Sequence, residues 1–165
     1  MWLVVLLAAS HLSADTGNWA TLSSEGLDLK VPVSSRLLRE SLLGRLLGVR
    51  QEVADLLGVT DVPPITAYVA ESESDFRTLT RGRLPHWGIG VAYPQAMTMV
   101  LQYRDGQSAA LLQTARHEFS HLLLHHAVSG HPSTRPVPVW FNEGVAMWVA
   151  SEWRLEQSLG VSLAA

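Results

Sequence analysis

Two histidines four positions apart, His117 and His121, place the strongest constraint on how this chain can fold. They lie in a Leu-rich stretch, from about residue 108 to 128, that is typical of a helix. Four helical residues advance by about 400°, so the two imidazoles lie one turn apart and can converge on one point beside the helix. Glu118 is rotated by about 100° from His117, so it is poorly placed to join them but can reach a water molecule at that point.

A pair of histidines needs a third ligand from elsewhere in the chain before it forms a catalytic metal site. We expect Glu143, which follows His121 after 21 intervening residues and lies at the start of the next predicted helix. The intervening loop contains three prolines and lets the second helix double back against the first. Two His and one Glu form a known catalytic zinc site. The sequence therefore predicts one Zn²⁺ per chain, held by His117, His121 and Glu143.

The pattern His-Glu-x-x-His on a helix is also a motif of zinc proteases. Zinc acidifies its water and polarises the substrate carbonyl, so Glu118 would act as general base and then pass the proton to the leaving amine. We therefore expect a metallopeptidase. The alternative is that both histidines are solvated helix residues, although a Glu118 buried between imidazoles would then be costly.

Composition excludes several other kinds of site. The chain has no cysteine, so disulfides, Cys-based metal sites and thiol nucleophiles are ruled out. A metal must be held by His and carboxylate ligands, which suit zinc. The formal net charge of −3 provides no basic footprint for nucleic acid. A length of 165 residues fits one domain.

The N-terminus begins with an apolar run, MWLVVLLAA, too short to span a bilayer but suited to the apolar part of a secretory signal. No Lys or Arg precedes it, and a buried strand is the alternative. We expect residues 1–14 to be a signal peptide or disordered lead-in and 15–165 to form the domain. The expected location is exported, periplasmic or extracellular, with membrane association as a further option but no other membrane span.

Hydrophobic periodicity predicts early strands followed by two consecutive helices, which favours an α+β fold over a doubly wound α/β fold. Strands are expected at residues 19–24, 27–33, 65–70 and 97–103. Helices are expected at residues 36–57, 72–79, 108–128 and 139–159, and residues 81–92 are expected to form a Gly-rich loop.

Three sequence blocks resemble the peptidase MA-like family of gluzincin metallopeptidases, in the thermolysin-like clan. They are HEFSHLLLHH (117–126), PVWFNEGVAMWVA (138–150) and, more weakly, HWGIGVAYPQAMTMVL (86–101). The resemblance implies a zincin-like fold: a small mixed sheet packed on an active-site helix and a second, Glu-bearing helix. It also implies peptide or protein substrates, and a strand at 97–103 that borders the cleft and could pair with an extended peptide.

The resemblance leaves two roles unassigned. The position one turn after Glu143, which carries a supporting acid in thermolysin, is Met147 here. Family members usually continue beyond the Glu-bearing helix, so the domain could be truncated at its C-terminal end, and the group that stabilises the oxyanion is not identified.

Other residues are interpreted more simply. His125 is expected to be a polar helix end, His86 a turn residue, Trp87 a core anchor and Asn142 a helix cap, while His131 is a weak candidate for oxyanion stabilisation. Trp140, Trp148 and Trp153 are expected to pack in the core or a lid. Two alternatives to the peptidase stay open: a catalytically silent domain used for binding or assembly, and a zinc hydrolase of another substrate class.

Overall fold

A computed structural model of the chain describes residues 19–35, 39–82, 89–129 and 137–152. The expected lead-in at 1–14 lies outside these residues, as do His86, Trp87, His131 and Trp153. Among the described helices, none combines the length and the apolar character needed to cross a membrane.

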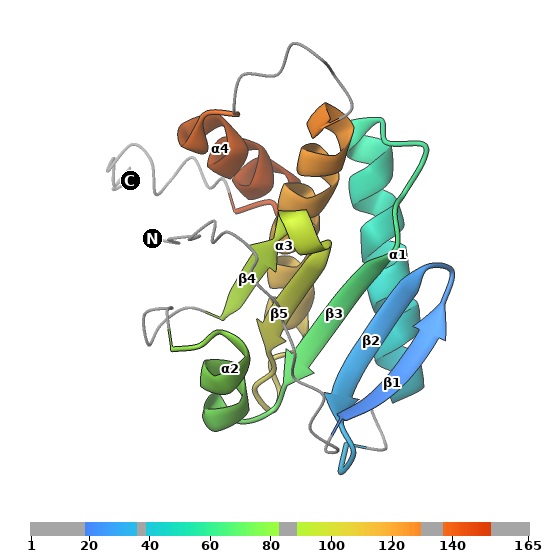
Figure 1. Cartoon of the computed structure of the whole chain (residues 1–165), viewed down its shortest axis with the longest axis vertical. Helices are drawn as coiled ribbons and strands as arrows, with labels where there is room; N and C mark the ends of the chain where they lie inside the picture. The colour runs from blue at the N-terminus through green and yellow to red at the C-terminus, as the bar shows by residue number, and fades with distance from the viewer. Residues whose placement is uncertain (1–18, 36–38, 83–88, 130–136, 153–165) are drawn as a thin grey trace, which may run out of the picture.

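The described part of the chain is built on a five-stranded mixed sheet with the order β1-β2-β3-β5-β4 (Figure 1). The parallel core of the sheet is β2, β3 and β5, and the outer strands β1 and β4 pair antiparallel to β2 and β5. The strands are β1 (Trp19–Ser24), β2 (Leu27–Pro32), β3 (Ile65–Ala70), β4 (Gly90–Tyr93) and β5 (Thr98–Gln102).

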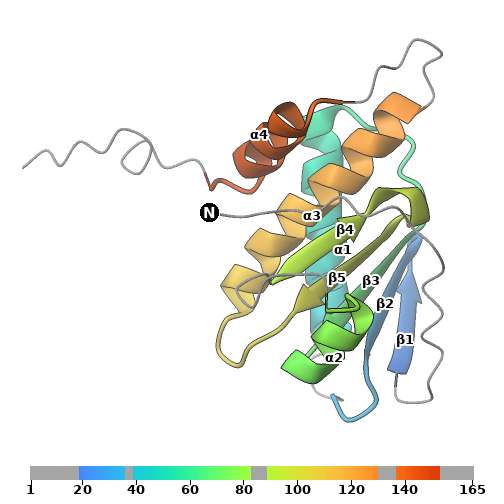
Figure 2. The same ribbon diagram turned by 60° about the vertical axis from the view of Figure 1, so that its left-hand side comes forward.

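Helices cover both faces of this sheet unequally (Figure 2). The larger core lies where α1 (Arg39–Leu57) and α3 (Ser108–Ser129) pack on one face, and it includes Leu29, Leu46 and Phe119. The short helix α2 (Glu73–Leu79) covers part of the other face through Phe76 and Leu79. The last described helix, α4 (Val139–Val149), packs against α3. The predicted α+β class, with a small mixed sheet packed on helices, is confirmed.

Local signals explain several element boundaries. Helix α2 begins after Ser72, whose hydroxyl accepts a hydrogen bond from the backbone N–H of Asp75 at 3.0 Å, as an N-cap does. Helix α1 ends before Gly58, whose φ of 68° suits the left-handed position that follows a helix.

Two predicted elements are wrong. Residues 90–92 were expected in a loop but belong to β4 (Gly90–Tyr93), the edge strand next to β5. Only four residues long and preceded by a Gly-rich segment, β4 is too short to show the alternation that marks a strand. As a consequence β5 is flanked on both sides, by β3 and β4, so it cannot offer the free edge expected of 97–103.

The last helix also ends ten residues earlier than predicted. Ser151 takes a left-handed φ of 55°, and the N–H groups of Ser151 and Glu152 return to the carbonyls of Trp148 and Met147. These two bonds form a Schellman motif, which normally has Gly at the left-handed position. With Ser there, the sequence does not indicate the end of the helix.

Candidate metal centre

Helix α3 carries the two histidines on the side that faces α4. The exposed fractions of His117, Glu118 and His121 are 2%, 2% and 1%. The apolar side chains of Leu111, Phe119 and Leu122 pack in the main core and fix the rotation of the helix. With this rotation the two imidazoles are directed away from the main core, and their ring centroids lie 4.9 Å apart.

Helix α4 brings Glu143 to both histidines. One carboxylate oxygen of Glu143 lies 3.6 Å from Nε2 of His117, and the other lies 3.7 Å from Nε2 of His121. One possible ligand atom from each residue lies within 4.8 Å of those from the other two. The structure therefore brings together the three residues chosen from sequence, and this group could hold a metal ion.

The spacing of the three side chains fits a bound cation better than a hydrogen-bonded cluster. Distances of 3.6 and 3.7 Å exceed the usual N–H···O length of about 2.7–3.2 Å. Two ligand atoms about 2.0–2.1 Å from a tetrahedral ion lie about 3.3–3.4 Å apart, close to what is observed.

Buried polar atoms without a hydrogen-bond partner also favour a bound metal ion. Within the described part of the chain, Oε2 of Glu118, Oε1 of Glu143, Oε1 of Glu152 and both ring nitrogens of His121 are buried without a hydrogen-bond partner. Leaving such groups unpaired is costly in a protein interior. A dication would satisfy ligand atoms among them and offset the negative charge of the nearby carboxylates, so the residues fit a metal.

Glu118 points toward β4, on the side of α3 expected from its rotation relative to His117. A Cβ added to Gly90 would lie 2.8 Å from Oε1 of Glu118, so only glycine leaves room for this carboxyl group. The pKa of Glu118 is raised to about 8, mainly by burial and also by Glu143 and Glu152, while His117 and a hydrogen bond with the backbone of Ala92 act to lower it.

The outer edge of β4 faces this carboxyl group. The N–H of Gln102 donates to the carbonyl of Ile89 at 2.8 Å, which marks these two residues as a hydrogen-bonded pair. Because bonded and non-bonded pairs alternate in an antiparallel ladder, Gly90 and Ala92 direct their main-chain groups away from β5. Of the strands that the structure describes, β4 is therefore the outermost one beside the site, where the backbone of Ala92 is hydrogen-bonded to Glu118.

Sequence reasoning missed Glu152, which contacts the other nitrogen of His117. A carboxylate oxygen of Glu152 lies 3.2 Å from Nδ1 of His117, and its side chain is 7% exposed. Burial alone would lower the pKa of His117, but Glu143, Glu152 and Glu118 together raise it to about 10. No local motif marks Glu152, because its place depends on the turn at Ser151.

The environment of His121 differs from that of His117. Burial and the neighbouring His117 lower the pKa of His121, while Asn142, Glu143 and Glu152 oppose this shift. Asn142 is therefore part of the site rather than the expected helix cap: the N-cap of α4 is Pro138, and Asn142 is buried within the helix.

The remaining candidates lie outside the cluster. His125 contacts the hydroxyl of Ser129 in the last turn of α3 and is not among the grouped ligands, as expected for a helix end. Trp140 and Trp148 were expected in the core or a lid, but they are 75% and 57% exposed. They lie on the outer side of α4, whose buried side carries Asn142 and Ala146.

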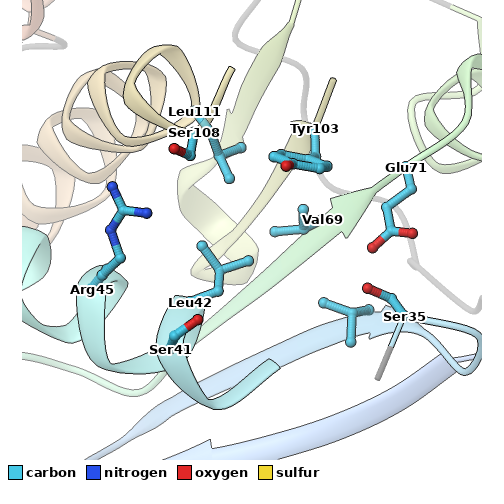
Figure 3. Close-up of a pocket in the computed structure, with 10 residues that line it drawn as sticks. Ser35, Ser41, Leu42, Arg45, Val69, Glu71, Tyr103, Ser108 and Leu111 are labelled. Atoms are coloured by element: carbon cyan, nitrogen blue, oxygen red, sulfur yellow. The ribbon is translucent and has the colours of Figure 1, made fainter. Parts of the chain in front are cut away.

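A separate pocket lies near the first turns of α1 and α3 (Figure 3). Its labelled lining includes Arg45, Glu71, Tyr103 and Ser108, and it contains none of the clustered His and Glu residues. Ser108 precedes His117 by nine helical residues, about 13 Å along the axis, so the pocket is distinct from the candidate metal centre.

Comparison with known protein families gives no matching family model, and comparison with curated proteins gives no significant match.

Proposed function

We propose that the chain is a zinc-dependent metallopeptidase. The observation that supports this most directly is the convergence of His117, His121 and Glu143 from two helices, with the carboxyl group of Glu118 buried beside them. All three ligands are of the kind that zinc takes in hydrolases with two His and one Glu. The absence of cysteine leaves no competing thiolate site.

The residues would divide the work as follows. His117, His121 and Glu143 hold the ion, which when bound acidifies a water molecule and polarises a carbonyl group. A bound dication would lower the pKa of Glu118 from its metal-free value of about 8, and the ionised carboxylate accepts the proton of the attacking water and delivers it to the leaving amine. The low exposure of Glu118 keeps bulk solvent from competing for that proton.

The edge of β4 supports a peptide as the substrate. An extended peptide can add to an exposed strand through main-chain hydrogen bonds, which serve any amino-acid sequence. Gly90 directs its main-chain groups away from β5, beside Glu118, and is partly exposed, so a peptide would pair with β4 at this residue. Ala92 is fully buried, and its backbone is already hydrogen-bonded to Glu118. This proposal replaces the expectation that β5 pairs with the substrate.

A silent binding domain, the main alternative, is less favoured by one detail. Gly90 provides the space occupied by the carboxyl group of Glu118, although Glu118 is not one of the three grouped ligands. A scaffold that only held a metal would not need a buried acid at this position.

The test begins with metal content. The chain is purified without added metal or chelator, and zinc per chain is quantified by elemental analysis for the wild type and Glu143→Ala. About one zinc per chain in the wild type, as expected for one such site, and its loss in the variant would support the site. No uptake even after zinc is added would refute it.

Catalysis is tested next with a mixed peptide library and mass spectrometry. Zinc-loaded wild type should cleave peptides, and Glu118→Gln should keep the zinc but lose cleavage. Cleavage that survives in Glu118→Gln would refute the role of this residue. Export is a separate proposal: N-terminal sequencing of the mature protein should show that residues 1–14 have been removed.

A further inference from the structure

The chain segment that follows α4 carries a carboxylate with no role in the proposed reaction so far. Glu152 lies nine positions after Glu143, and its side chain returns to His117. His117 therefore lies between two carboxylates from one segment, with Glu143 near Nε2 and Glu152 at 3.2 Å from Nδ1.

We propose that Glu152 is a positioning residue that holds His117 in the metal-binding orientation and tautomer. A carboxylate at Nδ1 accepts the N–H there, which leaves the lone pair of Nε2 directed toward His121 and Glu143. This inference rests on the metal site of the proposed function, but it concerns how the site is built rather than what it hydrolyses.

The backbone around Glu152 is fixed in a way that suits such a role. The Schellman turn at Ser151 directs the chain back, with the N–H of Glu152 bonded to the carbonyl of Met147 at 2.9 Å. Gln113 of α3 donates to the carbonyl of Ala150 at 3.2 Å. Gln113 and His117 are one helical turn apart, so one side of α3 anchors both this turn and the carboxylate that follows it.

The two histidines are supported unequally. Nδ1 of His117 faces the carboxylate of Glu152, whereas the neighbour of His121 that is not a candidate ligand and opposes the lowering of its pKa most is the neutral side chain of Asn142. Helix α4 thus supplies a direct ligand, and the turn after it supplies the support for a second ligand. We infer that α4 and its C-terminal turn act as one unit that both closes and orients the metal centre.

Zinc affinity provides the test, because it does not require a known substrate. Zinc is titrated into the metal-depleted wild type, Glu152→Gln and Glu152→Ala in competition with a chromogenic chelator. Loss of the carboxylate in Glu152→Ala should weaken zinc binding about 10–100-fold. Glu152→Gln keeps the shape and one acceptor oxygen, so its loss should be smaller.

The matched control is Glu52→Gln. Glu52 accepts two hydrogen bonds from Arg116, the residue before His117, but its side chain is 58% exposed and does not reach the metal centre. An exposed ion pair contributes little to the stability of the fold, so Glu52→Gln should bind zinc with the affinity of the wild type.

A spectroscopic measurement separates orientation from general loss of structure. In zinc-loaded wild type labelled with ¹⁵N at histidine, the ring spectrum should show His117 protonated at Nδ1, with a slowly exchanging proton. Glu152→Ala should lose this protected proton while its circular dichroism stays that of a folded chain.

The outcomes distinguish the two proposals. Equal zinc affinity and an unchanged His117 spectrum in Glu152→Ala would overturn the role of Glu152, even if the wild type binds zinc and cleaves peptides. A tenfold or greater loss, about 1.4 kcal/mol at 25 °C, would support it even if no peptide is cleaved. A wild type that takes up no zinc would overturn both.

Discussion

Gly90→Ala should separate catalysis from metal binding. Gly90 is not among the residues with positive φ, so its backbone accepts alanine. The obstacle is space: the new Cβ would overlap Cγ2 of Thr114 and lie 2.8 Å from Oε1 and 3.2 Å from Cγ of Glu118. None of these atoms belongs to the three grouped ligands.

The size of the effect follows from these contacts. Ordinary contact begins at 3.4 Å, so from 2.8 Å the carboxyl group of Glu118 must move by about 0.6 Å (3.4 − 2.8), or β4 must move away from α3. A catalytic group misplaced by about 1 Å can lose about 100-fold in rate, so we expect kcat/KM to fall by about 10–100-fold. Overpacking should also cost about 1–3 kcal/mol of stability.

The assay compares zinc content, thermal unfolding and peptide cleavage. Each kcal/mol should lower Tm by about 2–4 °C in a chain of this size. The controls are Gly48→Ala and Gly144→Ala, two helical glycines whose added Cβ would meet nothing within 4 Å. Each control should leave the free energy of unfolding unchanged or raise it by about 0.5–1 kcal/mol, since alanine is the better helix former.

A second variant tests whether contact with Thr114 and Glu118 causes the losses expected in Gly90→Ala. Thr114→Ser removes the nearest obstacle, Cγ2, while its hydroxyl can still donate to the carbonyl of Ala110. Combined with Gly90→Ala, it should recover part of the stability but less of the activity, because the contact with Glu118 persists. Wild-type stability and activity in Gly90→Ala alone would refute the close packing of β4 against Glu118.

Three further predictions concern the metal and the turn after α4. Zinc uptake should release protons, because His117 has a pKa of about 10 and carries a proton at pH 7 that zinc must displace. Glu118, with a pKa of about 8, can release a second proton, so zinc affinity should rise at least about tenfold per pH unit from 6 to 8; a flat profile would contradict this. Removing zinc with a chelator should lower Tm, by an amount that grows with the affinity and free concentration of zinc; an unchanged Tm would argue against a folded-state site. Ser151→Gly should raise stability by about 1 kcal/mol in thermal unfolding, because glycine adopts the left-handed φ of 55° without strain; a loss of stability would show that the Ser side chain matters.

The proton on His117 also affects stability in the absence of a metal. Its pKa is raised above the ordinary value, so the folded state gains stability that is fully present below about pH 6.5 and is lost as pH rises toward 10. The pKa of Glu118 is raised as well, to about 8, which acts in the same direction: ionising this buried acid costs stability as pH rises above 4.5.

Local periodicity was sufficient to predict the pairing of the two candidate histidine ligands and the fold class. Residues four apart on a helix share one face whatever surrounds them, so His117 and His121 had to lie together once their helix was recognised. Glu143 required one tertiary assumption, that α4 returns to α3, and the short loop with its prolines made that assumption reasonable. The alternation in residues 27–33 likewise identified β2.

Only the tertiary structure could show the support around these ligands. Which strand lies at the edge of the described sheet depends on the pairing of distant segments. The sequence therefore did not show that β4, rather than β5, lies outermost beside the site. The position of Glu152 depends on a left-handed Ser151, which no residue preference indicates. The role of Gly90 arises from contact with Thr114 and Glu118, more than 20 positions away. The sequence determined which groups can bind a metal, because that depends on local spacing; the structure decided what orients them, because that depends on packing between segments far apart in the chain.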